Sequence, residues 1–75
     1  MRIKFSRHAK RRARLYGVSE SIIADILTNT DLHQGEHEII RNAEGFRFPL
    51  KIVVFVKEDL VTVITNYPLK KGRKR

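Results

Sequence analysis

PLKIVVFVKEDLVTVITNY, residues 49–67, has the pattern of two β-strands joined by a short turn. Residues 49–56 and 60–67 are rich in β-branched and aromatic side chains, and the polar residues 57–59 separate them. Pro68 ends the second strand, because proline lacks the N–H that a strand interior needs. Strict alternation along the second strand predicts one face made of Val61, Val63, Thr65 and Tyr67, and an opposite face made of Leu60, Thr62, Ile64 and Asn66.

A short strand and a basic helix are predicted at the N-terminus. Residues 2–5 alternate in polarity and predict the strand. Ser6 is a residue type that caps helix N-termini, and Gly17 is a typical helix end. Between these two residues, an apolar stripe at helical spacing is formed by Ala9, Ala13 and Tyr16. Nearly all the other side chains of this helix are charged, so its remaining sides are expected to face solvent.

A second helix and an extended segment follow. Residues 19–28 predict a helix that begins after Ser19 as its cap. The buried face of this helix is predicted to consist of Ile22, Ile23, Ile26 and Leu27. Residues 32–48 look extended, with a turn at residues 43–45. The order of elements predicts an α+β fold, in which two N-terminal helices pack on a three- to four-stranded antiparallel sheet.

The length and composition indicate one small domain of the cytoplasm. A core of this size typically supplies about 3 to 5 kcal/mol of net stability, and the 75 residues include no cysteine that could add a disulfide. The N-terminus turns basic at once, unlike a secretory signal. The longest apolar run, residues 52–56, is far shorter than a membrane span. We expect a soluble protein without membrane contact, with a domain at residues 1–69 and a flexible basic tail at residues 70–75.

The net charge of +8 is concentrated at the two ends of the chain. Residues 1–14 contain seven Lys or Arg and residues 70–75 contain five, with no acid in either segment. All eight carboxylates lie between Glu20 and Asp59. If the two ends meet in the fold, they form a basic patch of the kind that binds polyanions. A tail kept only for solubility is the alternative for residues 70–75.

The basic helix contains side chains that suit cleavage of RNA without a metal. Such cleavage needs a base for the 2′-hydroxyl proton, an acid for the leaving 5′-oxygen and positive charge for the phosphorane. His8 is of the residue type that changes charge near neutral pH, and Arg11 and Arg12 follow it at i+3 and i+4. Tyr67 could donate a proton or orient the phosphate, and Thr65 could hydrogen-bond it.

Each of these side chains also has a structural interpretation. His8 could pack against the sheet, and Arg12 could pair with a carboxylate or a backbone carbonyl of the sheet. Tyr67 could close the core with its ring while its hydroxyl reaches water. His33 and His37 have the spacing of metal ligands on a helix, but Gly35 between them and the extended pattern argue against a helix. We therefore expect no metal and no cofactor.

Four short motifs carry a resemblance to a known family. They are HAKRR at residues 8–12, YGVS at 16–19, PLKIVV at 49–54 and VITNYP at 63–68. Over roughly residues 5–68 the chain resembles a family of small bacterial domains marked by HAxxR and VITxYP. That family is regarded as related to the RelE and BrnT type of toxin in toxin–antitoxin pairs. Its members often carry arginine where this chain has Tyr16, which puts a phosphate contact there in doubt.

The resemblance implies a RelE-like fold and a toxin that is a metal-independent endoribonuclease, acting on RNA that includes ribosome-bound mRNA. It also implies a protein antitoxin that covers the basic surface. The catalytic residues are then expected to be His8, Arg12 and Tyr67. The nucleic-acid contacts are expected from Arg7, Lys10, Arg11, Arg14, Thr65, Lys70, Lys71 and Arg73. The alternative is a noncatalytic module that binds nucleic acid or ribosomes through the same surface.

Overall fold

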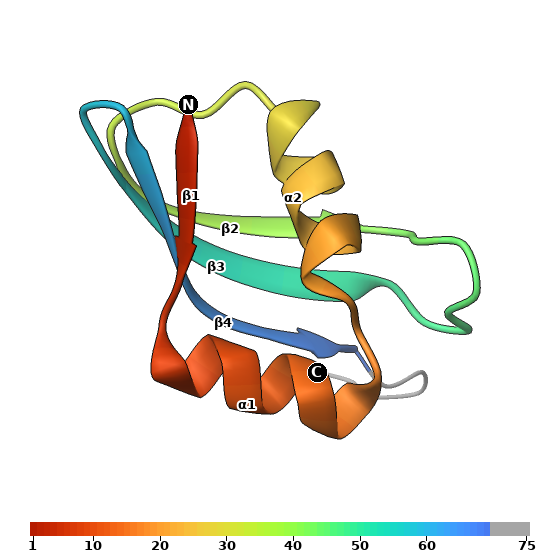
Figure 1. The fold of residues 1–75 in the computed structure, drawn as a ribbon. Helices are drawn as coiled ribbons and strands as arrows, with labels where there is room; N and C mark the ends of the chain where they lie inside the picture. Colours follow the sequence, from red (N-terminus) through yellow and green to blue (C-terminus); the bar gives the residue numbers. More distant parts are fainter. Residues whose placement is uncertain (70–75) are drawn as a thin grey trace.

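Two helices and a four-stranded sheet make up residues 1–69, the part of the chain that the computed structural model describes (Figure 1). The elements in chain order are β1 (Arg2–Phe5), α1 (Arg7–Tyr16), α2 (Glu20–Thr28), β2 (Gly35–Arg41), β3 (Leu50–Lys57) and β4 (Leu60–Pro68). The predicted α+β class is confirmed. The predicted basic tail at residues 70–75 lies outside the described residues. No helix in residues 1–69 is long and apolar enough to cross a membrane.

The sheet is mixed, with strand order β1-β4-β3-β2. β3 runs antiparallel to both β2 and β4, but β1 runs parallel to β4, with Ile3 opposite Val61. The prediction of a wholly antiparallel sheet is therefore wrong for β1. A turn of two residues joins β3 to β4 and forces opposite directions, whereas both helices and the β2–β3 pair separate β1 from β4 in the sequence.

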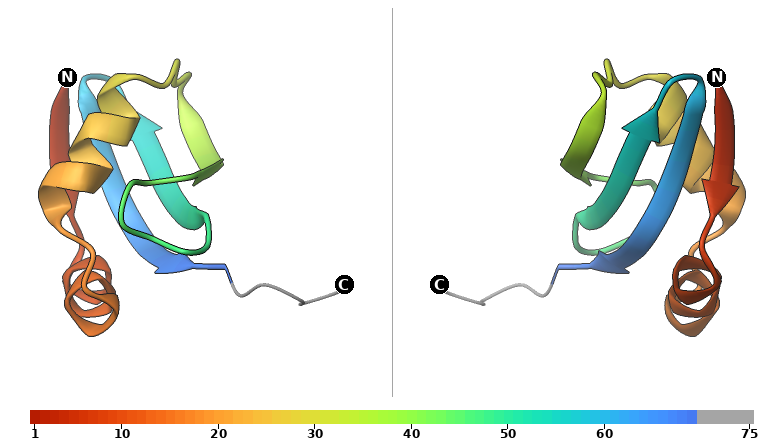
Figure 2. Two further views of the ribbon diagram at one scale, coloured as in Figure 1. Left: turned by 90° about the vertical axis from the view of Figure 1, so that its right-hand side faces the viewer. Right: turned by 90° about the vertical axis from the view of Figure 1, so that its left-hand side faces the viewer.

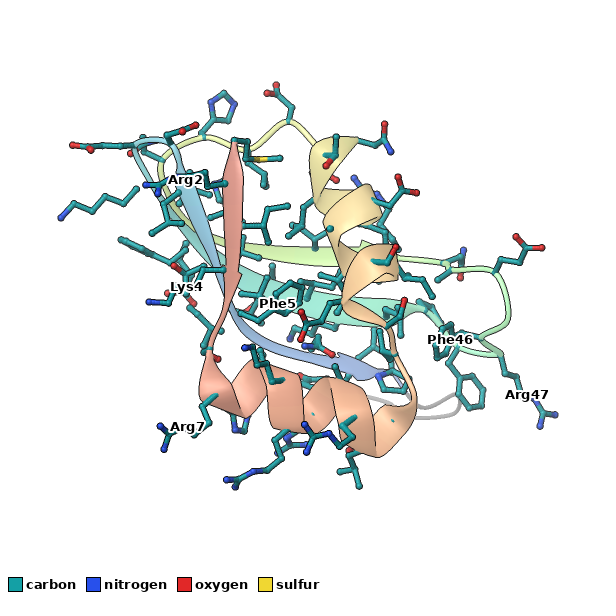
Figure 3. All side chains as sticks on the ribbon, viewed as in Figure 1. Arg2, Lys4, Phe5, Arg7, Phe46 and Arg47 are labelled. Carbon is teal, nitrogen blue, oxygen red and sulfur yellow. The ribbon has the colours of Figure 1, made fainter. Side chains whose placement is uncertain are left out.

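The core lies between one face of the sheet and the helices. α2 covers this inner face, and α1 lies on the same side along the second half of β4, beyond the residues that pair with β1 (Figure 2). The buried apolar side chains are Ala9, Ala13, Val18, Ile23, Leu27, Ile39, Leu50, Ile52, Val54, Val56, Val61 and Val63. Phe5 packs against this cluster, whereas Lys4 extends from the opposite side of β1 (Figure 3). The opposite side of the sheet, which we call the outer face, carries neither helix.

A bulge in β4 changes which side chains reach each face. Val54 pairs with Val63 but Val53 pairs with Thr65, so Ile64 is an extra residue without a partner. β4 bends in mid-strand (Figure 1), and the side-chain alternation shifts by one position beyond the bulge. Asn66, opposite Ile52, turns inward and is 1% exposed. The predicted single face of Val61, Val63, Thr65 and Tyr67 is therefore wrong, because strict alternation does not hold across a bulge.

Ser6 and Asn66 fix α1 against the bulged half of β4. The Ser6 hydroxyl accepts the first-turn N–H of Ala9 at 3.0 Å and donates to the carbonyl of Ile64 at 2.9 Å. The Ser6 N–H donates to the carbonyl of Val63 at 3.0 Å. The side-chain amide of Asn66 donates to the carbonyl of Ala9 at 3.2 Å. These bonds place α1 directly beside the strand end that carries Thr65 and Tyr67.

Replacing Ser6 by alanine should lower the free energy of unfolding by about 0.5–2 kcal/mol, the usual cost of losing an N-cap. The loss should fall toward the upper end, because the same hydroxyl also bonds to the Ile64 carbonyl at the bulge. Urea denaturation measures it. Ser19→Ala, which removes the α2 cap without a bond to the sheet, is the matched comparison. If Ser6→Ala lowers the free energy of unfolding by no more than Ser19→Ala does, the added role of Ser6 at the bulge is contradicted.

Candidate nucleic-acid interface

α1 presents two exposed sides next to its buried stripe. Ala9 and Ala13 face the sheet. Because successive residues of a helix are about 100° apart, the side chains divide around this stripe. On one side lies the basic flank, which we define as Arg7, Lys10 and Arg14. On the other side lies the histidine flank, which we define as His8, Arg12 and Tyr16. Arg11 points away from the sheet, and Arg7 extends outward at the first turn (Figure 3).

The positive charges of α1 have no carboxylate partner among residues 1–69. Within 4.0 Å, the ion pairs of this part of the chain join Asp59 to the N-terminal amine and to Arg2, and Glu38 to Lys51. The first turn of α1 contains no acid. Five guanidinium or ammonium groups therefore remain available to an external anion. Four of them are guanidinium forks, which match the geometry of phosphate oxygens.

The histidine flank contains one internal contact. Arg12 is half-buried, and its Nη1 donates to the hydroxyl of Tyr16 at 3.3 Å. Tyr16, at the position where the sequence resemblance predicts an arginine, thus contacts Arg12 through its hydroxyl. The His8 side chain is exposed and is not packed against the sheet. Among residues 1–69, no hydrogen bond joins His8, Arg12 and Tyr67 to one another, so their shared catalytic role stays a prediction.

Tyr67 lies on the outer face beside Lys51, its cross-strand partner on β3. Lys51 Nζ is 3.3 Å from Oε1 of Glu38 on β2. The hydrogen bond to Glu38 and the charge of that carboxylate raise the pKa of Lys51, and Tyr67 adds a smaller effect in the same direction. Lys51 is therefore a cation that pairs with Glu38 and lies beside Tyr67. Tyr67 is half-buried on this face and does not close the core.

Lys51 and Glu38 are site residues that the sequence reasoning missed. The sequence does mark Lys51, because it is a single charged residue at the start of an apolar strand. Alternation places its side chain on the same face of the strand as Val53 and Phe55. Its pairing with Tyr67 depends on the bulge at Ile64, which no sequence pattern marks. Thr65, opposite Val53, is half-buried on the same outer face, and its contact with phosphate stays a prediction.

The remaining predicted contacts lie elsewhere. Lys70, Lys71 and Arg73 fall outside the described residues, so the meeting of the two basic ends stays a prediction. His37 lies in the strand β2 and not in a helix, so His33 and His37 do not share a helix face. The Nε2 atom of His37 is 2.7 Å from the carbonyl oxygen of His33. In residues 1–69, no three His, Asp or Glu side chains gather as metal ligands do.

Comparisons with known proteins add no relative. No protein-family model, no curated protein and no solved structure matches the chain. The resemblance to RelE and BrnT relatives therefore stays a prediction, and the functional assignment depends on the positions of the side chains described above.

Proposed function

We propose that this chain binds RNA through α1 and cleaves it as a metal-independent endoribonuclease of the toxin type. One observation carries the proposal: an exposed histidine lies on a helix whose five Lys and Arg side chains have no carboxylate partner in residues 1–69. A helix with that charge attracts the phosphate backbone, and the histidine supplies a proton-transfer group at the same surface. A RelE-like domain is part of this proposal, and only its α+β class has the support of the observed elements.

The proposed reaction uses the substrate's own 2′-hydroxyl as the nucleophile. His8 takes the 2′-hydroxyl proton as the 2′-oxygen forms its bond to phosphorus. The bond between phosphorus and the 5′-oxygen breaks, and Tyr67 gives that oxygen a proton. Arg12 stabilises the charge of the phosphorane with its planar donors. The products are a 2′,3′-cyclic phosphate and a 5′-hydroxyl. A protein antitoxin would silence this reaction by covering α1 with acidic side chains.

The test is RNA cleavage by the purified chain, on naked RNA with and without EDTA and on mRNA in a translating extract without EDTA. We expect cleavage that survives EDTA and leaves 2′,3′-cyclic phosphate ends. DNA of the same sequence is the matched substrate, because it keeps the phosphates but lacks the nucleophile. It should bind and stay intact. Cleavage of the DNA, or cleavage of naked RNA that EDTA abolishes, would contradict the proposed chemistry.

A noncatalytic RNA-binding module is the second candidate. The observation that favours it is the lack of hydrogen bonds between His8, Arg12 and Tyr67 in residues 1–69, since a catalytic set often contains such bonds. Tight binding of RNA with no cleavage, in both naked RNA and translating extract, would select this candidate. The charged surface of α1 serves both functions.

The salt dependence of RNA binding should depend on α1. Each phosphate contact with a single strand contributes about 0.7 to the slope of log K against log salt. Replacing Arg11 and Arg14 by glutamine should therefore reduce the slope by about 1.4. Replacing Arg41 and Arg47 by glutamine makes the same change in net charge away from α1. Fluorescence anisotropy over a range of salt concentrations measures both variants, and equal slopes for the two would remove α1 from the binding site.

A further inference from the structure

The outer face of the sheet is an uncovered surface with an exposed aromatic ring near its centre. Both helices lie on the inner side (Figure 2), so the described residues leave the outer face open. Phe55 on β3 is 45% exposed there, and Ile64 at the bulge of β4 is 39% exposed. Phe55 forms no part of the core. An aromatic ring left in solvent on the face of a sheet has a free side that can stack on another ring.

Phe55 belongs to a row of three side chains that crosses three strands. Lys4 on β1 is opposite Thr62 on β4, and Thr62 is opposite Phe55 on β3. Opposite residues on neighbouring strands have Cβ atoms about 4.5–5.5 Å apart. The row therefore aligns an ammonium group, a hydroxyl and an aromatic ring on one surface. Lys4 is exposed and has no carboxylate within 4.0 Å among residues 1–69.

A second row repeats the combination of a ring and a cation at the bulged end of the face. Tyr67 lies opposite Lys51, four residues along β3 from Phe55. At about 3.3 Å per residue, the two rows are about 13 Å apart. The hydroxyl of Thr65 and the side chain of Ile64 lie between the rows. The surface thus extends from β1 toward the strand end beside α1, where the proposed phosphate contacts begin.

The charges on this face restrict where an anion can lie. Glu36 and Glu38 project from β2 on the outer face, as their pairing with Phe55 and Val53 requires. Lys4 and Arg2 belong to β1, at the opposite edge of the sheet. A polyanion is therefore favoured over β1, β4 and the Phe55 side of β3, and disfavoured over β2. Charge and rings together specify a ligand that has both phosphates and flat apolar groups.

We propose that the outer face of β1, β4 and β3 binds the unpaired bases of single-stranded RNA, with Phe55 stacking on a base and Lys4 contacting a phosphate. This inference depends on the proposed function, because α1 supplies the remaining phosphate contacts. Bases stack on aromatic side chains only when they are free of their own helix, so the face selects single strands over duplex. The selection is tolerant of sequence, since every base has a π-face.

The first experiment measures the affinity of single-stranded RNA and of its duplex by fluorescence anisotropy. Phe55→Val removes the ring but keeps a residue that favours strands. It should weaken single-strand binding roughly 5- to 150-fold, the loss of one stacked base, and leave duplex binding unchanged. Ile40→Val is the matched control, because Ile40 is 51% exposed on the outer face but belongs to β2. It should bind both RNAs like the original chain.

The second experiment reports stacking directly. The chain has no tryptophan, so Phe55→Trp introduces a single indole at the proposed contact. Single-stranded RNA should quench its emission, and affinity should match or exceed that of the original chain. Ile40→Trp places an indole on the same face at a side chain that is 51% exposed but belongs to β2, outside the proposed RNA contacts. It should show little quenching at the same RNA occupancy.

The outcomes separate this inference from the proposed function. Normal single-strand affinity in Phe55→Val, with binding still weakened in the Arg11 and Arg14 variant, would overturn the stacking surface and keep the role of α1. No RNA binding by the original chain would overturn both. A third outcome is that Phe55→Val abolishes the binding of a partner protein and leaves the affinity for RNA unchanged. In that case the outer face binds a protein, and the stacking surface for RNA would be overturned as well.

Discussion

Replacing His8 by glutamine should lower the rate of RNA cleavage by roughly 10²- to 10⁴-fold, the usual contribution of a general acid or base. RNA affinity should be retained, because the phosphate contacts come from the Lys and Arg side chains of the same helix. Stability should also be retained, since the His8 side chain is exposed and forms no hydrogen bond within residues 1–69. Single-turnover cleavage with saturating protein separates the chemical step from binding.

His33→Gln is the matched control for His8. It makes the same change of side chain at another exposed histidine, in the segment between α2 and β2. Its cleavage rate should equal that of the original chain. Tyr67→Phe keeps the ring on the outer face and removes the proposed proton donor, so it should also lose rate at normal affinity. If His8→Gln and His33→Gln cleave equally well, His8 is not the catalytic group.

Replacing Asn66 by aspartate should lower the free energy of unfolding by about 3–5 kcal/mol, the cost typical of a buried charge without a partner. Asn66 is 1% exposed, and its side-chain amide donates to the Ala9 carbonyl. In the aspartate variant an oxygen replaces the amide nitrogen, so the hydrogen bond is lost and a carboxylate oxygen faces the carbonyl oxygen of Ala9. The other carboxylate oxygen would occupy the position of Oδ1, which has no hydrogen-bond partner among residues 1–69. Because a core of this size supplies only about 3–5 kcal/mol of net stability, the variant would lose most of it.

The pH dependence of this variant has a definite sign. Burial raises the pKa of the introduced carboxyl above its unfolded value of about 3.9. The neutral acid is therefore favoured in the folded state, and the loss of stability should grow as the pH rises above about 4. Thermal denaturation between acid and neutral pH measures it. Asn42→Asp makes the same change at an exposed loop residue and should show neither the loss nor this dependence.

Local signals in the sequence predicted the elements well, because their causes are local. Ser6 and Ser19 cap α1 and α2 as expected, and Gly17 ends α1 with φ of 69°. Helical spacing predicted the apolar stripe of α1 in part: Ala9 and Ala13 are buried, but Tyr16 is 38% exposed and contacts Arg12 instead. The charge of α1 was also evident, since no acid occurs before Glu20. These features depend on residues a few positions apart and on the geometry of one helix.

Features that depend on distant pairing were missed. The bulge at Ile64 moves Thr65 and Tyr67 to the outer face and turns Asn66 inward, although alternation predicts otherwise. Nothing in residues 60–68 marks the extra residue, because a bulge is defined by the partner strand β3. The parallel placement of β1 was missed for a similar reason. A strand that joins a sheet edge without a connecting turn carries no signal for its direction.

By itself, the sequence determined that this protein is a small α+β domain with a basic helix that contains a histidine, because capping, periodicity and charge act over short distances along the chain. Only the tertiary structure decided what surrounds that helix. The pairing of β4 with β3 and β1 brings Lys51 beside Tyr67 and aligns Lys4, Thr62 and Phe55 on one open face. Register is a property of two strands together, so the surface that we propose for RNA bases exists only once the sheet has formed.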